Sequence, residues 1–496
     1  MGMAAWSGLA GSGDRAALYV VGGAAAVCAA LAAFLPPVPD HAYQFWMAER
    51  LLDGARMYVD VGAADMHPPL FTWSATALAA LGRALGVAGL GIYPVLVALA
   101  TLAALAGAWR LGLRAPLLLA AAVAALFPVA GPYFAQGEHL ALLCALPYLV
   151  AAAREEQRVP NSLAGRVAVA LAAAFGLAMK PYFALVWVGV ELYRARHGRA
   201  RELLRLENLL IGGAFVLYVV ATALFTPEFF RNLPWLAALY PRFAPVPLGS
   251  LLLDPRLALI VAGMLAVRLA PLAGFERRLA DILSIAAAAM YVALLAQEKG
   301  WGYHWYPAVA LAVVLLALAA RAYLSRARPL VAAALAAAAL AWMPFQVART
   351  EALLDAFPGH RTELAEVVER FGGESAFVAY SHLLSAGFPV VNVTGSAWAS
   401  PYGHLWMVPA MYRDAWAGRA PLRYGQEGRW RALEADILER LWAEVERQRP
   451  GLVLLERPQA SGFSMRRWLE LDARFAAWLA DAPLVARVGP YDVLRP

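Results

Sequence analysis

The chain almost lacks lysine. Its 42 lysine and arginine residues include only two lysines, Lys180 and Lys299, and arginine takes every other cationic position. The abundance of Ala, Arg and Gly indicates a GC-rich coding bias, which explains arginine in general but not these two exceptions. Lysine carries a compact ammonium point charge, whereas the guanidinium group of arginine is a planar fork. The two lysines therefore indicate positions where the shape of the cation matters.

Charged residues of every kind are scarce. Only 16% of the 496 residues are charged, while 62% are hydrophobic, and soluble domains contain about 25% charged residues. Apolar runs of about 18 residues or more recur, which is the length that crosses roughly 30 Å of hydrocarbon. The composition predicts a polytopic membrane protein embedded in a lipid bilayer. The net charge of +7 is no sign of a nucleic-acid partner, because cytoplasmic loops of membrane proteins concentrate basic residues.

Cysteine is equally rare. Cys28 and Cys144 both lie in apolar runs, which argues against a disulfide framework, and no spacing of Cys and His indicates a zinc site. The chain also lacks a P-loop and the glycine pattern of a dinucleotide-binding fold. Nucleotide-dependent chemistry therefore has no support in the sequence.

Eleven apolar segments are predicted to cross the membrane. The first follows Arg15 and is too long for the apolar region of a signal peptide, so we interpret it as an uncleaved span. Arginine-rich loops alternate with cation-poor loops through all eleven segments, which places the N-terminus in the cytoplasm and the C-terminal region outside the cytoplasmic (inner) membrane. The expected spans are 17–35, 90–109, 115–131, 139–153, 166–179, 181–193, 208–226, 256–270, 279–296, 305–320 and 329–347.

From about residue 348 the composition becomes that of a soluble domain. Short strand-like runs and one clear amphipathic helix, at 376–381, 389–393, 451–456, 491–495 and 430–447, predict a small α/β domain. The fold class is therefore an all-α polytopic membrane protein with a small C-terminal α/β domain. We expect a membrane module over 1–347, with outer loops 36–89 and 227–255, and an extracytoplasmic domain over 348–496. Its tryptophans Trp398, Trp406 and Trp416 are expected in a core.

The first outer loop combines several polar features. Asp40 falls just past the first span, where an ionised carboxylate is costly unless it meets water, a partner or a substrate. Residues 42–56 then read as an amphipathic helix lying in the membrane interface, and His-Pro-Pro-Leu follows at 67–70. Asp60 and Asp65 are expected to be solvated loop acids.

These features resemble the GT-C glycosyltransferases, membrane enzymes of the protein mannosyltransferase and aminoarabinose transferase type. The matching residues are Asp40, the run "AERLLDGARMYVD" at 48–60, "HPPLF" at 67–71, and Glu138 in "YFAQGEHLALLCALPYLVAAAR". The resemblance covers about residues 15–350. It implies a GT-C fold and a sugar donor linked to polyprenyl phosphate.

The resemblance implies that two acids are catalytic. Asp40 is the expected base that takes the proton of the acceptor hydroxyl; the alternative is a helix N-cap for 41–56. Glu138 corresponds to a second acidic residue of the superfamily, with a capping role as the alternative. Here "GEH" at 137–139 replaces a turn that contains Asp in common versions, so the metal requirement is open and a divalent cation is neither implied nor excluded.

The two lysines are predicted to bind the donor phosphate, with His304 as a helper. Lys180 and Lys299 fall in outer turns, on the same side of the membrane as Asp40 and Glu138, and an ammonium group suits a phosphate. Snorkelling toward lipid headgroups is the alternative. The predicted substrate-binding residues are His41, His67, His139, Trp301 and Tyr303, and an interfacial aromatic belt is the alternative for the two aromatic residues.

The sequence thus predicts an enzyme that moves a sugar from a polyprenyl-phosphate donor to a glycan, lipid or protein acceptor on the outer face of the membrane. A polysaccharide polymerase or ligase of the same fold is the close alternative. A transporter or flippase for a lipid-linked sugar is the alternative from another class, but it would need polar groups at the bilayer midplane, whereas the span interiors are mostly Ala, Leu and Val. A scaffold built on residues 348–496 would leave Asp40 and the lysines without a role.

Overall fold

The computed structural model describes residues 12–154, 162–197, 203–324, 327–356, 361–373, 375–458 and 462–496. Packing divides the chain into two compact units, each assembled from three separate stretches of sequence. Unit 1 comprises Met1–Pro36, Gly91–Ala221 and Val246–Thr350. Unit 2 comprises Pro37–Leu90, Thr222–Pro245 and Glu351–Pro496, so it contains most of both predicted outer loops. Whether 348–496 folds as a domain of its own stays a prediction.

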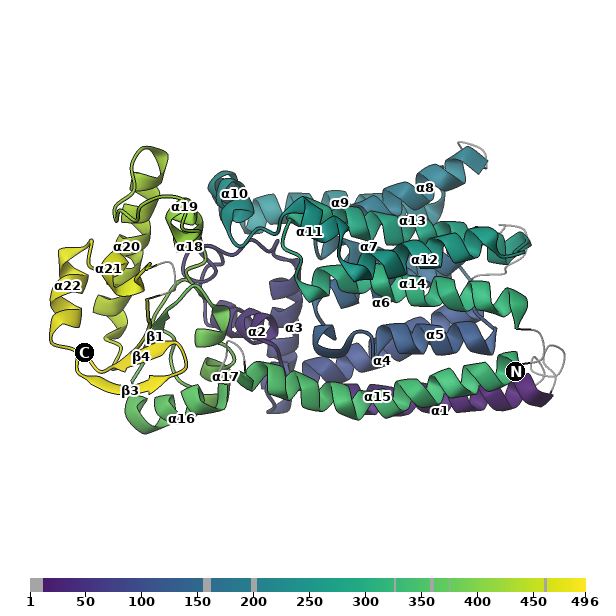
Figure 1. Ribbon diagram of the computed structural model, residues 1–496, viewed down its shortest axis with the longest axis horizontal. Coiled ribbons are helices and arrows are strands. Elements are labelled where there is room, and N and C mark those ends of the chain that lie inside the picture. The colour runs from purple at the N-terminus through teal and green to yellow at the C-terminus, as the bar shows by residue number, and fades with distance from the viewer. Residues whose placement is uncertain are drawn as a thin grey trace. The chain divides into compact units, whose positions relative to one another are not determined.

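Unit 1 is entirely helical over the residues that the structure describes. Several of its helices, including α6, α7, α13 and α14, pack alongside one another (Figure 1). The elements assigned mainly to this unit are α1 (Ser12–Ala32), α4 (Gly89–Leu111), α5 (Pro116–Leu126), η2 (Gly131–Tyr133), α6 (Gly137–Ala152), α7 (Leu163–Ala178), η4 (Pro181–Phe183), α8 (Ala184–His197), α9 (Leu206–Phe225), α11 (Leu248–Leu252), α12 (Pro255–Leu269), α13 (Gly274–Gln297), α14 (Gly302–Tyr323) and α15 (Arg328–Ala356).

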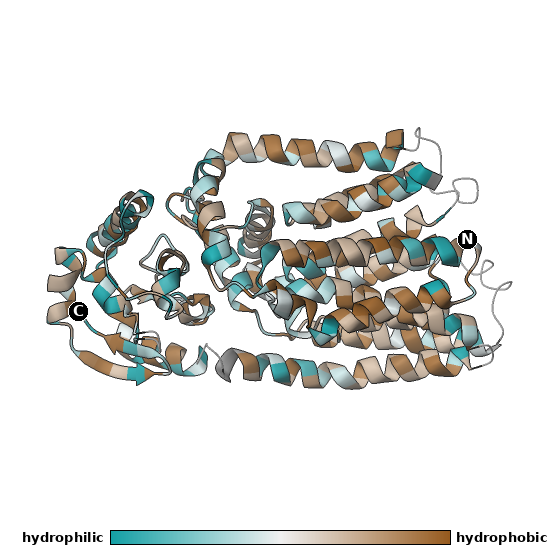
Figure 2. Ribbon diagram, turned by 45° about the horizontal axis from the view of Figure 1, so that its top comes forward, coloured by the Kyte–Doolittle hydropathy of each residue, from teal (hydrophilic) through white to brown (hydrophobic). Residues whose placement is uncertain are grey.

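A helix occupies each of the eleven ranges in which a span was expected. Within the described residues, six helices are long and apolar enough to cross a membrane, namely α1, α4, α9, α13, α14 and α15. Helices α5, α6 and α7 are apolar but shorter. Hydrophobic residues cover most of these helices (Figure 2). The structure thus supports a multi-pass membrane protein, while the count of eleven spans is not confirmed.

Small residues let the helices of unit 1 approach closely. A Cβ atom at Gly176 of α7 would lie 2.6 Å from Cβ of Cys144 and 2.8 Å from the carbonyl oxygen of Leu140, both in α6. Glycine at this position therefore brings the backbones of α6 and α7 together. Close approach of backbones through small residues is a common way for helices to associate in lipid, where apolar surfaces gain little from association.

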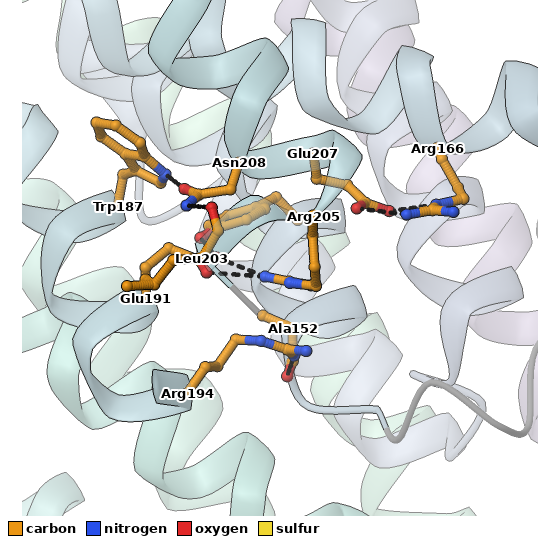
Figure 3. Close-up of polar contacts among 10 residues, drawn as sticks. Ala152, Arg166, Trp187, Glu191, Arg194, Leu203, Arg205, Glu207 and Asn208 are labelled. Atoms are coloured by element: carbon orange, nitrogen blue, oxygen red, sulfur yellow. Dashed lines mark hydrogen bonds and ion pairs between the residues drawn. The ribbon is translucent and has the colours of Figure 1, made fainter. Parts of the chain in front are cut away.

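Ion pairs and hydrogen bonds link α6, α7, α8 and the start of α9 (Figure 3). Both carboxylate oxygens of Glu191 in α8 accept hydrogen bonds from Arg205, at 2.8 and 2.9 Å, and the hydroxyl of Tyr148 in α6 donates to the same carboxylate at 2.6 Å. Arg166 and Glu207 form a bidentate pair between α7 and α9, at 2.6 and 2.9 Å. Paired in this way, the charges of Glu191 and Arg205 are tolerated inside the helix bundle.

Unit 2 places a four-stranded sheet among short helices. The strand order is β1-β2-β4-β3, with β1 parallel to β2 and the other neighbouring strands antiparallel. The elements assigned to this unit are α2 (Pro39–Leu52), α3 (Leu70–Leu85), α10 (Pro227–Leu239), η6 (Tyr240–Arg242), α16 (Arg361–Gly372), β1 (Phe377–Tyr380), η7 (Leu384–Ala386), α17 (Val390–Thr394), α18 (Met407–Met411), α19 (Arg413–Trp416), α20 (Arg429–Gln448), β2 (Leu452–Glu456), α21 (Met465–Leu469), α22 (Ala473–Ala480), β3 (Leu484–Val488) and β4 (Tyr491–Leu494).

Both faces of strands β1 and β2 are buried. Val378 and Val453 belong to the hydrophobic cluster on one face, whereas Phe377 and Leu452 belong to the cluster on the other. Side chains of a strand alternate between the two faces, so a strand covered on both sides needs a continuous apolar run. That is why these two strands were visible in the sequence as "AFVAYS" and "GLVLLE".

The structure confirms most of the expected elements of this region and corrects others. Helix α20 matches the amphipathic stretch 430–447, and Trp398 and Trp406 are buried as expected. The strand predicted at 389–393 is wrong, because Val390–Thr394 is a short helix in which the Thr394 hydroxyl donates to the Val390 carbonyl. Strand β3 was missed, because most of its residues are only partly buried or exposed and give no strong apolar signal.

Candidate functional site

Glu138, Lys180 and His304 lie together at one end of the unit 1 helices. Glu138 is in the first turn of α6, Lys180 precedes η4 in the turn between α7 and α8, and His304 is in the first turn of α14. The Nζ atom of Lys180 is 2.5 Å from Oε1 of Glu138, and Nε2 of His304 is 3.8 Å from the same oxygen. The structure therefore brings together three side chains that are distant in sequence.

Burial makes this ion pair different from those on a surface. The side chains of Glu138 and Lys180 are only 2% and 11% exposed. A buried pair of charges needs good geometry and further polar contacts to offset the loss of hydration, and removal of one partner typically costs about 3–5 kcal/mol. The position of Glu138 in the first turn of α6 contributes, because the positive end of the helix dipole stabilises a carboxylate.

Lys299 lies in the linker between α13 and α14. Two residues with positive φ surround it, Glu298 at 54° and Gly300 at 61°, and they turn the chain sharply between the helices. The Glu298 carbonyl accepts a hydrogen bond from the Val246 amide at 2.8 Å, which anchors the linker. Lys299 is only 2% exposed. A lysine that snorkels toward lipid headgroups keeps its ammonium group in water, so the burial of Lys299 argues against that alternative.

Aromatic side chains surround the ion pair. The Nζ atom of Lys180 lies 5.1 Å from the ring centroid of Tyr303, a distance at which the ring face attracts a cation. Trp301 contacts Tyr303 with a centroid separation of 5.6 Å. The hydroxyl of Tyr182 donates to Gln297 at 2.6 Å, and the sequence analysis missed this pair, since neither residue stands out in its segment.

His139 is buried beside this site but is engaged by the backbone. Its Nε2 atom is 2.9 Å from the carbonyl oxygen of Leu126, and its Nδ1 atom accepts from the Ala135 amide at 3.3 Å. Ala135 has a positive φ of 68°, so the turn before α6 is strained, and the hydrogen bond from the Ala135 amide to His139 stabilises this turn. The geometry favours a structural role, and substrate binding by His139 stays a prediction.

Asp40 lies in unit 2, in the first turn of α2. The N-cap of α2 is Val38 and Pro39 occupies its first turn, so the alternative that Asp40 is the N-cap is wrong. Gln44 follows one helical turn later on the same face. Its side-chain amide donates to Asp65 at 3.0 Å and its carbonyl oxygen accepts from the Thr72 hydroxyl. The helix that carries Asp40 is thus tied to the following loop.

Asp65 holds His67 in a fixed orientation. One carboxylate oxygen is 2.8 Å from Nδ1 of His67 and accepts from the His67 amide at 2.9 Å. The Asp65 side chain is 5% exposed, so the expectation of a solvated acid is wrong. Burial raises the pKa of Asp65, but the nearby charge of His67 and the hydrogen bonds from His67 and Gln44 outweigh burial and lower that pKa. Asp60 is the exposed loop acid that was expected.

His41, the other predicted substrate-binding residue of unit 2, is buried in α2. Its ring stacks on Phe71 of α3, with centroids 6.1 Å apart and planes 3° from parallel. Asp40, His41 and His67 thus belong to one compact unit, whereas the other predicted site residues belong to unit 1. Their convergence on one substrate stays a prediction.

A second histidine–carboxylate pair was missed by the sequence analysis. Glu456 ends β2, and it accepts hydrogen bonds from the Ser381 hydroxyl at 2.9 Å and the His382 amide at 3.1 Å, just after β1; Nδ1 of His382 is 2.8 Å away. Burial lowers the pKa of His404 to about 3, and the charges of Asp65, His382 and His67 also act on it. The sequence signal was the polar residues at the carboxyl ends of the two parallel strands, Ser381 and His382 just after β1 and Glu456 as the last residue of β2. Open α/β sheets bind ligands at this edge.

Within the described residues, no group of three or more His, Cys, Asp or Glu side chains has an arrangement that holds a metal ion.

No family model and no curated protein matches the sequence. The fold, however, matches ArnT from Cupriavidus metallidurans, solved bound to undecaprenyl phosphate and in the apo state. The TM-scores are 0.57 and 0.58 at 14% sequence identity, and each match covers 96% of this chain and 97% of ArnT. The chain has a GT-C fold. The sequence resemblance covered only about residues 15–350, whereas the structural match covers 96% of the chain. ArnT therefore also has a counterpart of the C-terminal region of this chain.

Proposed function

We propose that the protein is a membrane glycosyltransferase that takes a sugar from a polyprenyl-phosphate donor and passes it to an acceptor on the outer face of the cytoplasmic membrane. The observation that carries this proposal is the buried cluster of Glu138, Lys180 and His304 at turns expected to lie outside. The GT-C fold adds support, because a protein of that fold, ArnT, has been solved with undecaprenyl phosphate.

The cationic side chains would hold the departing phosphate. Lys180 and Lys299 contribute two buried ammonium groups, and Lys180 pairs with the buried carboxylate of Glu138. Ammonium groups in such poorly hydrated surroundings favour an anionic ligand, since charges attract strongly where water is excluded. Phosphate that gains negative charge as the bond to the sugar breaks is stabilised by such fixed donors.

Asp40 would act as the base. Its carboxylate accepts the proton of the acceptor hydroxyl while the hydroxyl oxygen attacks the anomeric carbon. The bond between that carbon and the phosphate oxygen breaks, and the polyprenyl phosphate leaves with the electron pair. A single displacement of this kind inverts the anomeric centre. His67, oriented by Asp65, and His41 are the side chains of the same unit that we assign to substrate binding.

A host that lacks this gene tests the proposal after complementation with wild type, Asp40→Asn or Asp60→Asn at matched protein levels. Mass spectrometry then reads its polyprenyl-phosphate sugars and its envelope glycans. We expect Asp40→Asn to accumulate a lipid-linked sugar while a glycan, lipid or protein loses that sugar. Asp60→Asn, which changes an exposed acid paired with Arg56, should behave as wild type. Unchanged products in Asp40→Asn would favour the transporter or scaffold interpretation.

A further inference from the structure

A pocket of about 550 Å³ lies within unit 2, and none of the predicted site residues lines it. It is formed by the end of α20, the start of β2 and α22, and its lining includes Trp442, Glu446, Arg449, Gly451 and Trp478. The volume falls within the range of about 300–1,000 Å³ that is typical of small-molecule sites. The surface at this end of the sheet is therefore hollowed on the scale of a small ligand.

Two tryptophans form perpendicular walls of this pocket. The ring centroids of Trp442 and Trp478 are 6.3 Å apart, with planes at 84°. One side of each ring packs on the hydrophobic core of the unit, and both side chains are only half-buried. Each ring therefore offers part of its apolar surface to a ligand while the core holds it in place.

The orientation of Trp442 is set by contacts on several sides. Its indole Nε1 donates to Oε1 of Glu446 at 2.7 Å, the ring of Phe475 meets it edge-on at 5.2 Å, and the guanidinium of Arg474 lies 5.5 Å from its centroid. A ring held in this way loses little conformational entropy when a ligand stacks on it.

Polar groups on the rim remain available to a ligand. Among the described residues, none accepts a hydrogen bond from the indole N–H of Trp478, and none pairs with the side chain of Arg449. Glu446 near the end of α20 and Arg449 at its C-cap both line the pocket, so the site offers an acceptor and a set of donors. Gly451 lets the chain pass close to Ser375, because a Cβ atom there would lie 2.7 Å from Cβ of Ser375.

We propose that this pocket is a carbohydrate-binding site that takes a sugar ring of a glycan. A sugar ring has an apolar face of C–H groups that stacks on an indole, and an edge of hydroxyls that both donate and accept hydrogen bonds. The tryptophan walls match the face, and Glu446 and Arg449 match the edge. A purely apolar partner would leave the rim carboxylate and guanidinium desolvated without compensation. This site goes beyond the proposed transfer reaction, because binding here needs neither donor nor catalysis.

Binding to an array of immobilised envelope oligosaccharides tests this proposal, with the full chain in lipid nanodiscs. The variants are Trp478→Ala, Trp478→Phe, Arg449→Ala and Trp430→Ala. Trp430 is the matched control, since it lies on α20 outside the pocket. We expect wild type and Trp430→Ala to retain the same oligosaccharides, Trp478→Ala and Arg449→Ala to lose at least tenfold in affinity, and Trp478→Phe to keep part of it.

Two results would overturn the site. One is that wild type retains no oligosaccharide above empty nanodiscs, and the other is that Trp478→Ala and Arg449→Ala bind as wild type does. An unfolding midpoint measured for each variant separates loss of binding from loss of folding. Because the assay contains no lipid-linked sugar, its outcome does not depend on the Asp40→Asn experiment.

Discussion

At the scale of single residues, the scarcity of lysine acquires a structural meaning. Both lysines are buried in unit 1 at turns that are predicted to lie outside, and Lys180 contacts Glu138 and the face of Tyr303. A guanidinium group is larger and planar, so it would not fit between these partners in the same way. Lysine is therefore kept, despite the coding bias toward arginine, where the surrounding side chains leave room only for a compact cation.

Replacement of Lys180 by arginine tests this interpretation. We expect Lys180→Arg to lower the rate of sugar transfer from a polyprenyl-phosphate donor in proteoliposomes by at least tenfold. The loss should reach about 10²–10³ if the ammonium group is a main hydrogen-bond donor to the departing phosphate. The exposed Arg231→Lys serves as the control, and its rate should stay unchanged. A full rate in Lys180→Arg would show that positive charge alone suffices at this turn.

The buried carboxylate of Asp65 should make the stability of unit 2 depend on pH. Its folded pKa is lowered from an unfolded value of about 3.9. The stabilisation by ionised Asp65 is therefore fully present above about pH 4 and is lost as pH falls through the folded pKa. At pH 7, Asp65→Asn should destabilise unit 2 by about 1–3 kcal/mol, because it weakens hydrogen bonds to a charged group.

Thermal unfolding of the wild type and Asp65→Asn, followed by tryptophan fluorescence between pH 7 and pH 3, measures this effect. The difference between the two midpoints should be constant down to about pH 5 and shrink below about pH 4. Asp60→Asn is the control, since the exposed pair of Asp60 and Arg56 is worth about 0–1 kcal/mol. Equal midpoints at pH 7 would contradict the inferred role of Asp65.

At the scale of elements, the packing of α6 on α7 determines where Glu138 and Lys180 stand. Glu138 begins α6, and Lys180 comes just after α7. Their side chains meet because the two helices are antiparallel neighbours in close contact along their length. A change in the separation of these helices should therefore alter the ion pair as well as the stability.

Two glycine substitutions separate close packing from helix propensity. Gly176→Ala places Cβ within 2.8 Å of two atoms of α6, so we expect destabilisation by about 1–3 kcal/mol, as in other overpacked sites. In Gly23→Ala the new Cβ in α1 meets nothing within 4 Å, so a gain of about 0.5–1 kcal/mol is expected. Unfolding midpoints in the same detergent compare the two, and equal shifts would contradict the inferred role of Gly176.

At the scale of the whole molecule, the orientation in the membrane is testable by cysteine labelling. In a Cys28→Ala, Cys144→Ala background, Arg196→Cys and Arg423→Cys introduce exposed thiols on opposite predicted sides. A membrane-impermeant maleimide should label Arg423→Cys in intact cells, but Arg196→Cys only after permeabilisation. The reverse result would place the Glu138 and Lys180 turns in the cytoplasm and remove the basis for an extracytoplasmic reaction.

The GT-C fold was predictable because its main signal is local. An apolar run long enough to cross a bilayer specifies a helix without reference to the rest of the chain, and all eleven expected ranges contain helices. The strands β1 and β2 were equally visible, since both of their faces are buried. The less buried β3 and the short helix at Val390–Thr394 depend on what packs beside them, so no local pattern revealed them.

The candidate site was predictable only as a set of residue types. Local composition was enough to predict that the two rare lysines and Glu138 lie near the ends of spans on one side of a membrane, because alternation of spans and the arginine bias are local features. Three contacts became visible only in the folded chain: Lys180 meets Glu138, Asp65 is buried against His67, and Trp442 and Trp478 line a pocket. These contacts either join residues far apart in sequence or depend on other elements that enclose a side chain. The burial of each side chain and the charges around it are therefore set by tertiary packing and not by the local sequence.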